Sequence, residues 1–121
     1  MILQERNITT LMNSWKLYLM INTESQKTKY GIDFTKGFKK QFKKVIKQGK
    51  DIKKFSYVVE KLANKENLEP KFKNHTLVNC KEYFECGECH IEPNWLLVYR
   101  YKDDKLILLL VATGSHSELF K

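Results

Sequence analysis

The sequence predicts an α+β fold in which a helical hairpin packs on a small antiparallel sheet. Two consecutive stretches between residues 36 and 62 repeat apolar residues with helical spacing, and a short polar connection separates them. Later in the chain, three stretches with strand-like apolar patterns follow one another, joined by short polar turns. With one further strand before the first helix, the predicted order is β-α-α-β-β-β, followed by a short C-terminal helix.

The chain of 121 residues is expected to form one domain with an N-terminal extension. Residues 29–121 carry the compact pattern and make up the predicted domain. Residues 1–28 differ, because their apolar residues follow helical spacing after Asn7, which is a suitable N-cap. We therefore expect a helical extension that is loosely held. The alternatives are a helix that packs on the domain or on a partner, and a true start at Met20.

The helical hairpin is predicted from its caps and its apolar faces. The alternation in residues 30–34 predicts the first strand. Thr35 is placed to cap a helix that ends at Gly49, and Asp51 to cap a second helix. The short connection predicts that the two helices lie antiparallel. The residues predicted to face the core are Phe38, Phe42, Val45 and Ile46 in the first helix, and Ile52, Phe55, Val58, Val59 and Leu62 in the second.

The sheet is predicted from the last part of the chain. Residues 66–77 contain Pro70 and no periodicity, which predicts a loop. Turns at 92–94 and 103–104 join the strands that follow, and such short turns require antiparallel pairing. The run 106–111 is apolar on both faces, so its strand is expected to be central. The predicted strands span residues 83–91, 95–102 and 105–113.

The charge predicts a polyanionic partner. Lysine and arginine total 22 against 14 acidic residues, a net charge of +8, which suits a nucleic acid, an acidic protein or a membrane surface. Only Arg6 and Arg100 are arginines, and lysine binds phosphate without reading bases. No acidic residue interrupts the stretch from Lys36 to Lys50, so the like charges of the first helix favour contact with RNA or DNA over a merely solvated face. The lysines predicted to bind RNA are Lys36, Lys39, Lys40, Lys43, Lys44 and Lys47.

Neither a secretory signal nor an apolar run of membrane-spanning length is present in the sequence, so a cytoplasmic protein with reduced cysteines is expected. Cys86 to His90 spells C-x-x-C-H, the haem attachment pattern, but haem attachment requires export. A zinc site built from Cys80, Cys86, Cys89 and either His75 or His90 is an alternative that lacks a second C-x-x-C pair. Packed or surface thiols are the favoured interpretation.

The three histidines indicate acid–base chemistry at phosphate, since imidazole titrates nearest neutrality. Ser115 and Glu118 have the spacing of a capping box, which places His116 in the first turn of a short terminal helix. The N–H groups at such a helix end attract phosphate, so His116 would lie beside the anion that it protonates. Phe120 lies one turn later, where it would stack on a base or close the core.

Two stretches together resemble a known family. They are E-C-H-I-E-P-N-W-L-L-V-Y at residues 88–99 and T-G-S-H-S-E-L-F at residues 113–120. With the predicted element order they resemble YafQ-type toxins, which are mRNA interferases of the RelE/ParE superfamily, and the resemblance covers about residues 29–120. It implies a RelE-like fold and an endoribonuclease of a type II toxin–antitoxin system that cleaves mRNA on the ribosome without metal or other cofactor. The implied partners are a cognate acidic antitoxin, mRNA and ribosomal RNA, and no membrane is implied.

The resemblance also implies roles for individual residues. The implied catalytic residues are His75, His90 and His116, and the implied supporting or substrate-positioning residues are Asn94, Trp95 and Phe120. In this scheme the 2′-hydroxyl attacks the adjacent phosphate, His75 or His90 is the base, and His116 protonates the leaving oxygen. The products would be a 2′,3′-cyclic phosphate and a free 5′-hydroxyl.

This chain departs from the family at three places, one of which is residues 86–90, where C-G-E-C-H stands for the common Y-R-E-C-H. Asn94 stands where the family has aspartate, and Ala112 where it usually has arginine. Loss of a charge donor at a transition state costs about 3–4 kcal/mol, or roughly a hundred- to a thousandfold in rate. The chain is therefore either a slow enzyme or a catalytically weakened binding module, unless another cation substitutes. A gyrase poison of the ParE branch is a further alternative, which the histidines disfavour. The candidate substitutes are Lys71, Lys73, Lys81 and Arg100.

Overall fold

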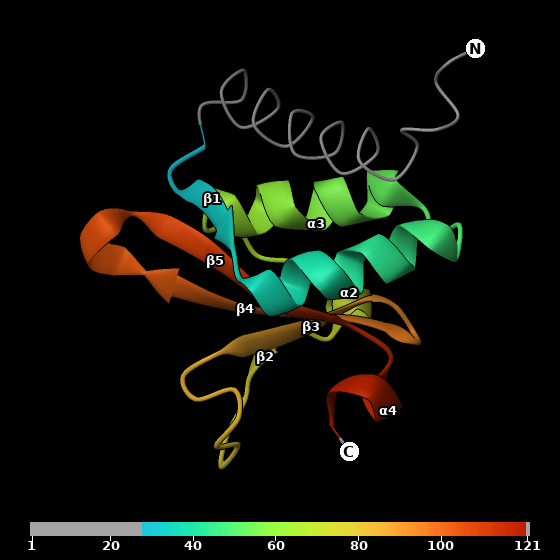
Figure 1. The fold of residues 1–121 in the computed structure, drawn as a ribbon. Coiled ribbons are helices and arrows are strands. Elements are labelled where there is room, and N and C mark those ends of the chain that lie inside the picture. Colours follow the sequence, from blue (N-terminus) through green and yellow to red (C-terminus); the bar gives the residue numbers. More distant parts are fainter. Residues whose placement is uncertain (1–27, 121) are drawn as a thin grey trace.

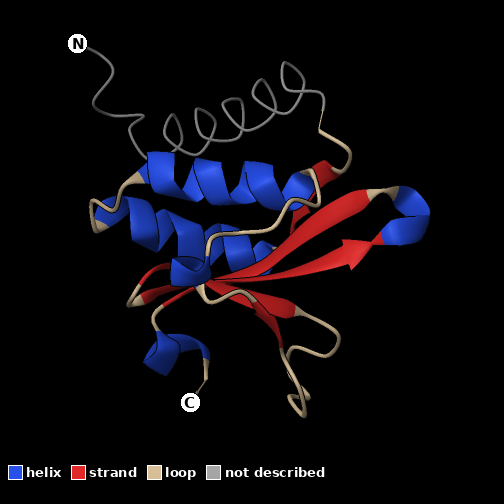
Figure 2. Cartoon of the chain, turned by 180° about the vertical axis from the view of Figure 1, so that it is seen from behind, coloured by secondary structure: helices blue, strands red, loops and turns tan. Residues whose placement is uncertain are grey.

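Two helices cover one face of a five-stranded sheet in the computed structural model, which describes residues 28–120 (Figure 1). The view from behind shows the same two layers, with the C-terminal turn of helix below the sheet (Figure 2). The predicted α+β architecture, a helical hairpin on a sheet, is confirmed. The helix predicted within the N-terminal extension lies outside the described residues.

The two helices begin at the predicted N-caps. Helix α2 spans Lys36–Lys47, and the Phe38 amide donates to Thr35 Oγ1 at 3.0 Å. Helix α3 spans Ile52–Ala63, and the Lys53 amide donates to Asp51 Oδ1 at 3.0 Å. Each cap satisfies a backbone N–H that the first helical turn leaves without a partner. The buried residues of the two helices are Phe38, Phe42, Val45, Phe55, Val58, Val59, Leu62 and Ala63.

Aromatic rings fill the space between the helices and the sheet. The Phe42 and Phe55 rings lie 4.6 Å apart between centroids, which joins α2 to α3. The Phe55 ring stacks on Trp95 at 6.3 Å, which joins α3 to the sheet. All three side chains are fully buried. The core of the domain is therefore the layer between the hairpin and the sheet.

The sheet is mixed, with strand order β1-β5-β4-β3-β2. Strand β1 pairs with β5 in parallel, and the remaining pairs are antiparallel. The predicted wholly antiparallel sheet was therefore wrong at β1, because the alternation of an isolated strand carries no information on its direction. The predicted central position of the last strand is confirmed. The strands span Gly31–Phe34 (β1), His75–Thr76 (β2), Gly87–Glu92 (β3), Trp95–Lys102 (β4) and Ile107–Gly114 (β5).

The segment between the helices and the sheet is more ordered than predicted. The expected loop at residues 66–77 contains a 3-10 turn at Pro70–Phe72 and the short strand β2. The expected strand at residues 83–91 starts only at Gly87, since the residues before it form turns. A Cβ atom at Gly87 would lie 2.6 Å from the Tyr99 ring, so only glycine fits there.

A second, smaller apolar cluster covers the opposite face of the sheet. Its buried members come from the loop before β3, from β4, from β5 and from helix α4, which spans His116–Leu119. This cluster fixes the loop and the C-terminal helix against the sheet face that α2 and α3 leave uncovered. The buried members are Tyr83, Cys86, Leu96, Val98, Ala112 and Leu119.

Candidate functional site

Strand register brings two of the predicted catalytic residues, His75 and His90, onto the sheet face that carries the second cluster. One cross-strand row runs His75, Glu88, Val98 and Ala112 through β2, β3, β4 and β5. The next row runs His90, Leu96 and Gly114, and His116 follows two residues later. Directly paired residues in a sheet point to the same face, and adjacent strands lie about 4.8 Å apart.

A bulge in β5 determines which side chain faces the site. Tyr99 pairs with Leu110, and its neighbour Val98 pairs with Ala112, so Val111 is an extra residue without a pair. The extra residue reverses the alternation, which puts Leu110 in the helix-side core and Ala112 in the second cluster. The Thr35 hydroxyl donates to the Val111 carbonyl at 2.8 Å, so the carbonyl of the extra residue has a hydrogen-bond partner.

The imidazoles of His75 and His90 meet at one carboxylate oxygen. His75 Nε2 lies 3.1 Å from Glu88 Oε1, and His90 Nε2 lies 3.8 Å from the same atom. His75 Nδ1 lies 2.8 Å from the Lys73 carbonyl oxygen. Both nitrogens of His75 therefore face acceptors, and both contacts are hydrogen bonds only when the ring carries both protons.

Glu88 is the site residue that sequence reasoning missed. Only 6% of its side chain is exposed, although glutamate is seldom buried without a partner. The available signal was its position two residues before His90 in a strand, which puts both side chains on one face. Its Oε1 atom lies within hydrogen-bond distance of His75 Nε2 and within ion-pair distance of His90 Nε2.

Helix α4 presents His116 on a capped turn. The Ser115 amide donates to Glu118 Oε1 at 2.8 Å, and the Glu118 amide donates to Ser115 Oγ at 3.3 Å. The predicted capping box is therefore confirmed. His116 is exposed, and its ring packs on Phe120 with centroids 5.0 Å apart. Phe120 in turn contacts the Tyr83 ring edge-on at 5.5 Å, so one aromatic row supports the imidazole.

The phosphate-attracting helix end expected at His116 is weaker than predicted. Helix α4 has only four residues, so few peptide dipoles add together. The capping box uses the backbone N–H groups of Ser115 and Glu118, and it also places a carboxylate at the helix start. Any attraction of phosphate to this helix end must therefore come mainly from side chains.

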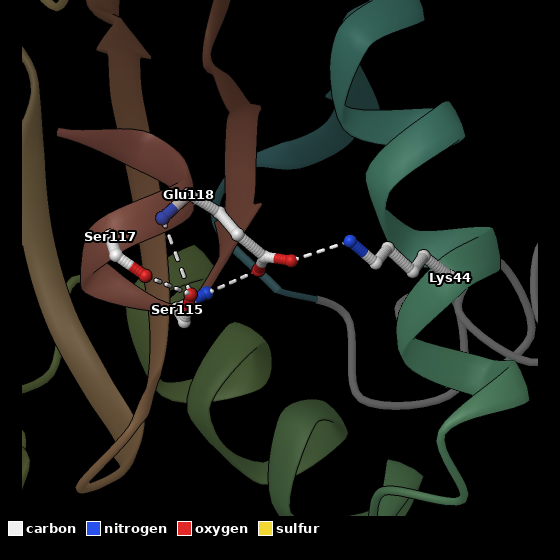
Figure 3. Close-up of polar contacts among 4 residues, drawn as sticks. All are labelled: Lys44, Ser115, Ser117 and Glu118. Carbon is white, nitrogen blue, oxygen red and sulfur yellow. Dashed lines mark hydrogen bonds and ion pairs between the residues drawn. The ribbon is translucent and has the colours of Figure 1, made fainter. Parts of the chain in front are cut away.

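An ion pair joins the capping box to the basic helix. Lys44 Nζ lies 2.6 Å from Glu118 Oε2, and Figure 3 shows the lysine reaching from α2 to the carboxylate. The pKa of Glu118 is lowered to about 2, chiefly by the hydrogen bond from Lys44 and next by the hydrogen bond from the Ser115 amide. Lys44 therefore has an acidic partner 74 residues away, which the local charge pattern of α2 did not reveal.

The other lysines of α2 form the predicted basic face. Lys43 is partly buried, while Lys36, Lys39, Lys40 and Lys47 are exposed. Within residues 28–120, Lys44 is the one α2 residue that forms an ion pair. These lysines are thus available to a polyanion, with Lys44 committed to Glu118.

Trp95 and Asn94 do not lie on the sheet face that carries His75 and His90. Trp95 is fully buried on the helix side of the sheet, and its Nε1 donates to Thr113 Oγ1 at 2.9 Å. It can support the site through the core, but it cannot contact a substrate. Asn94 is exposed in the turn between β3 and β4, as the sequence predicts.

The cysteines are divided between the two faces of the sheet, with Cys80 packed against the second cluster. Cys89 is buried in the helix-side core, whereas Cys86 belongs to the second cluster on the opposite face. Burial raises the pKa of the Cys89 thiol to about 12 and also raises the pKa of Cys86, which disfavours the thiolates that zinc needs. Within residues 28–120, no group of three or more His, Cys, Asp or Glu side chains is arranged to hold a metal ion. None of the helices in this range is long and apolar enough to span a bilayer.

Residues 30–121 match the family described as the bacterial toxin of type II toxin–antitoxin systems, YafQ. The chain belongs to this family. It is 31% identical over 90 residues to the mRNA interferase toxin YafQ of Escherichia coli BL21-DE3, covering 74% of this chain and 94% of that protein.

Solved structures of YafQ-like toxins share the fold. The crystal structure of a metal-bound toxin from Helicobacter pylori is 42% identical, with a TM-score of 0.69, over 75% of this chain and 99% of that one. The E. coli DinJ–YafQ complex contains a chain that is 30% identical, with a TM-score of 0.66, over 76% of this chain and 99% of that one. The family match begins at residue 30 and so leaves the N-terminal extension uncovered.

Ala112, where the chain departs from the YafQ pattern, is packed among the buried residues of the second cluster. Ala112 is 3% exposed, because the second cluster covers it. An arginine at this position would lack the open space that a substrate-facing guanidinium needs. Arg100, a candidate substitute, is exposed on β4 and pairs with Glu85 at 3.6 Å. Lys71, another candidate, lines a surface pocket of about 490 Å³ together with His90.

We expect Ala112→Arg to lower the free energy of unfolding by about 1–3 kcal/mol, because the larger side chain overpacks a covered position. Urea denaturation of the purified protein measures this change. Ala112→Leu adds bulk without charge, so comparing the two variants separates size from charge. An Ala112→Arg protein that is as stable as wild type and cleaves RNA faster would contradict this expectation and identify position 112 as a missing charge donor.

We also expect stability to fall in acid through Glu118. Its folded pKa of about 2 lies below the ordinary value of 4.5, so the charged carboxylate stabilises the fold. That contribution is complete above pH 4.5 and is lost as the pH falls towards 2. The urea midpoint of wild type should therefore drop more between about pH 5 and about pH 3 than that of Glu118→Gln. Equal drops would show that the ion pair and capping box add nothing to the folded state.

Proposed function

We propose that this YafQ-family toxin is an endoribonuclease that cleaves mRNA on the ribosome. The observation that supports the proposal is that His75, Glu88 and His90 share one sheet face, against which helix α4, the helix that begins at His116, also packs. Two imidazoles sharing a carboxylate, together with a third imidazole on a capped turn, supply general base and general acid without metal. The name of the E. coli relative, mRNA interferase toxin, supports the same reaction.

The geometry favours different roles for the two paired histidines. A general base must offer a nitrogen without a proton, and His75 has an acceptor beside each nitrogen. We therefore assign His75 as a cation that holds the phosphate, and His90 as the base that removes the 2′-hydroxyl proton. The 2′-oxygen attacks phosphorus, the P–O5′ bond breaks, and His116 donates its proton to the leaving 5′-oxygen. The products are a 2′,3′-cyclic phosphate and a 5′-hydroxyl.

The direct test of the activity is induced expression in bacteria. Growth should arrest, and mapping of mRNA 5′ ends should show new ends with a hydroxyl group inside coding regions. The 3′ fragments should resist ligation until a kinase phosphorylates them, because the leaving group is a hydroxyl. Intact messages in cells that contain folded protein would refute the endoribonuclease proposal.

The proposed partners are a cognate acidic antitoxin, mRNA and ribosomal RNA, which places the site of action in the cytoplasm. The net charge of +8 and the exposed lysines of α2 support polyanionic partners. An E. coli relative has been solved in complex with DinJ, its antitoxin. Co-purification with the product of a neighbouring gene tests this partner. Binding should weaken as salt rises, because salt screens the charged part of the contact.

A second candidate function is a binding module with weakened chemistry. The covered Ala112 and the uncharged Asn94 favour it, since alanine supplies no donor and asparagine can hydrogen-bond but cannot carry a charge or take up a proton. The two candidates differ in single-turnover cleavage on programmed ribosomes. An enzyme cleaves the bound message, whereas a binding module associates with the same ribosomes and leaves the message intact. If Asn94→Asp creates cleavage that wild type lacks, the binding-module interpretation is supported.

A further inference from the structure

Helix α2 contacts the segment that carries His116 at two successive positions. Gln41 Oε1 accepts from the Thr113 amide at 3.0 Å, at the end of β5. One turn later, Lys44 donates to Glu118 in α4 at 2.6 Å. The two contacts lie on either side of the Gly114–Ser115 connection, so α2 holds both ends of the segment that leads into the C-terminal helix.

Both oxygens of the Glu118 carboxylate are in use. Oε1 accepts from the Ser115 amide, and Oε2 accepts from Lys44 (Figure 3). A Cβ atom at Gly114 would lie 2.8 Å from Oε1, and Gly114 has a φ of +153°. Glycine at this position therefore gives the carboxylate the room that it needs to cross the connection and reach both donors.

Helix α4 needs such contacts because it is too short to be stable alone. It has four residues and buries only Leu119, whereas isolated helices shorter than about 12 residues are marginal in water. His116 is its first residue, so the direction of the imidazole follows the orientation of this single turn. The capping box and the Lys44 contact define that orientation.

We propose that Lys44 is a positioning residue for His116, and that it acts through the Glu118 carboxylate rather than by binding RNA. The proposal rests on the proposed function, because it assigns Lys44 to the general acid of that reaction. The ion pair is exposed, with 62% of the Lys44 side chain and 38% of the Glu118 side chain accessible. Exposed pairs contribute little to global stability, so Lys44 variants should fold normally and change the placement of His116.

The chain offers a matched control on the same helix. Lys40 lies one turn before Lys44 and is also exposed, and within residues 28–120 it forms no ion pair. The test compares Lys44→Met with Lys40→Met in single-turnover cleavage of a short mRNA on programmed ribosomes. Ribosome affinity is to be measured separately. Lys44→Met should slow cleavage by about ten- to a hundredfold with little loss of affinity, as small misplacements of a catalytic group do. Lys40→Met should weaken affinity and leave the rate of the bound complex nearly intact.

Two further measurements make the test independent of activity. In Lys44→Met, the NMR signals of the His116 ring and the Ser115 amide should shift, and the apparent pKa of Glu118 should rise towards 4.5. Lys40→Met should leave all of these signals in place. Lys44→Arg should restore both the signals and the cleavage rate, because arginine also donates to the carboxylate.

Each outcome decides the proposal. Equal losses of affinity in the two methionine variants, with unmoved His116 signals, would return Lys44 to the RNA-binding lysines and overturn it. Shifted His116 signals with an unchanged cleavage rate would overturn it as well, since the contact would then have no catalytic consequence. If wild type cleaves nothing, the proposed function fails, while His116 signals that shift in Lys44→Met alone would still support the positioning contact.

Discussion

Replacing His116 with alanine is expected to reduce mRNA cleavage by about a hundred- to ten-thousandfold, the usual contribution of a positioned acid. His116 is exposed on a capped turn, with its ring packed on Phe120 and no ionic partner within residues 28–120. Single-turnover cleavage on programmed ribosomes measures the loss directly, and growth after induced expression reports it in cells.

The control for this variant is its fold and its partner binding. His116→Ala removes an exposed side chain, so the urea midpoint and antitoxin affinity should stay close to wild type. His116→Gln keeps a hydrogen-bonding side chain of similar size, but glutamine cannot act as an acid. This variant should therefore be nearly as inactive as His116→Ala. A His116→Ala toxin that arrests growth as wild type does would remove this residue from the acid role.

Replacing Trp95 with alanine is expected to lower the free energy of unfolding by about 3–5 kcal/mol. The side chain is fully buried, stacks on Phe55 and donates to Thr113. Alanine leaves a cavity between the helical hairpin and the sheet, and it also removes the hydrogen bond. Urea denaturation followed by circular dichroism measures the change, and a domain with only ordinary stability would lose most of its folded population at 37 °C.

Trp95→Phe is the matched control, since it keeps an aromatic ring in the core. The Thr113 hydroxyl still donates to the Leu96 carbonyl at 2.7 Å, so Thr113 keeps one partner and the loss should be about 1 kcal/mol. If Trp95→Ala left stability intact and abolished cleavage, the residue would contact the substrate after all. That result would contradict its complete burial.

The sequence predicted those features that depend on neighbouring residues. Thr35, Asp51 and Ser115 cap helices as expected, because an N-cap acts on amides two or three residues away. Strand β4 spans Trp95–Lys102, as its apolar pattern and flanking turns predict. The sequence did not predict that His75 and His90 share a face, since residues 66–77 were expected to be a loop and the pairing of β2 with β3 brings the two histidines together.

Features that depend on distant residues were not predictable in the same way. The parallel pairing of β1 with β5 requires knowledge of the whole topology. The bulge at Val111 is invisible in a run of apolar residues, although it decides that Ala112 faces the second cluster. The contact between Lys44 and Glu118 joins residues 74 apart, so no local charge pattern reveals it.

The central place of β5 has a consequence for how the protein is made. Thr35 bonds to Val111 across 76 residues, and β1 has no strand partner until β5 exists. Chains dominated by such non-local pairings fold slowly, because a long loop must close before its contacts form. A ribosome synthesising this protein has therefore completed both long helices and β2–β4 before the sheet can close. Until then His116, which follows β5, cannot join His75 and His90, so the proposed site is incomplete through most of the synthesis of the chain.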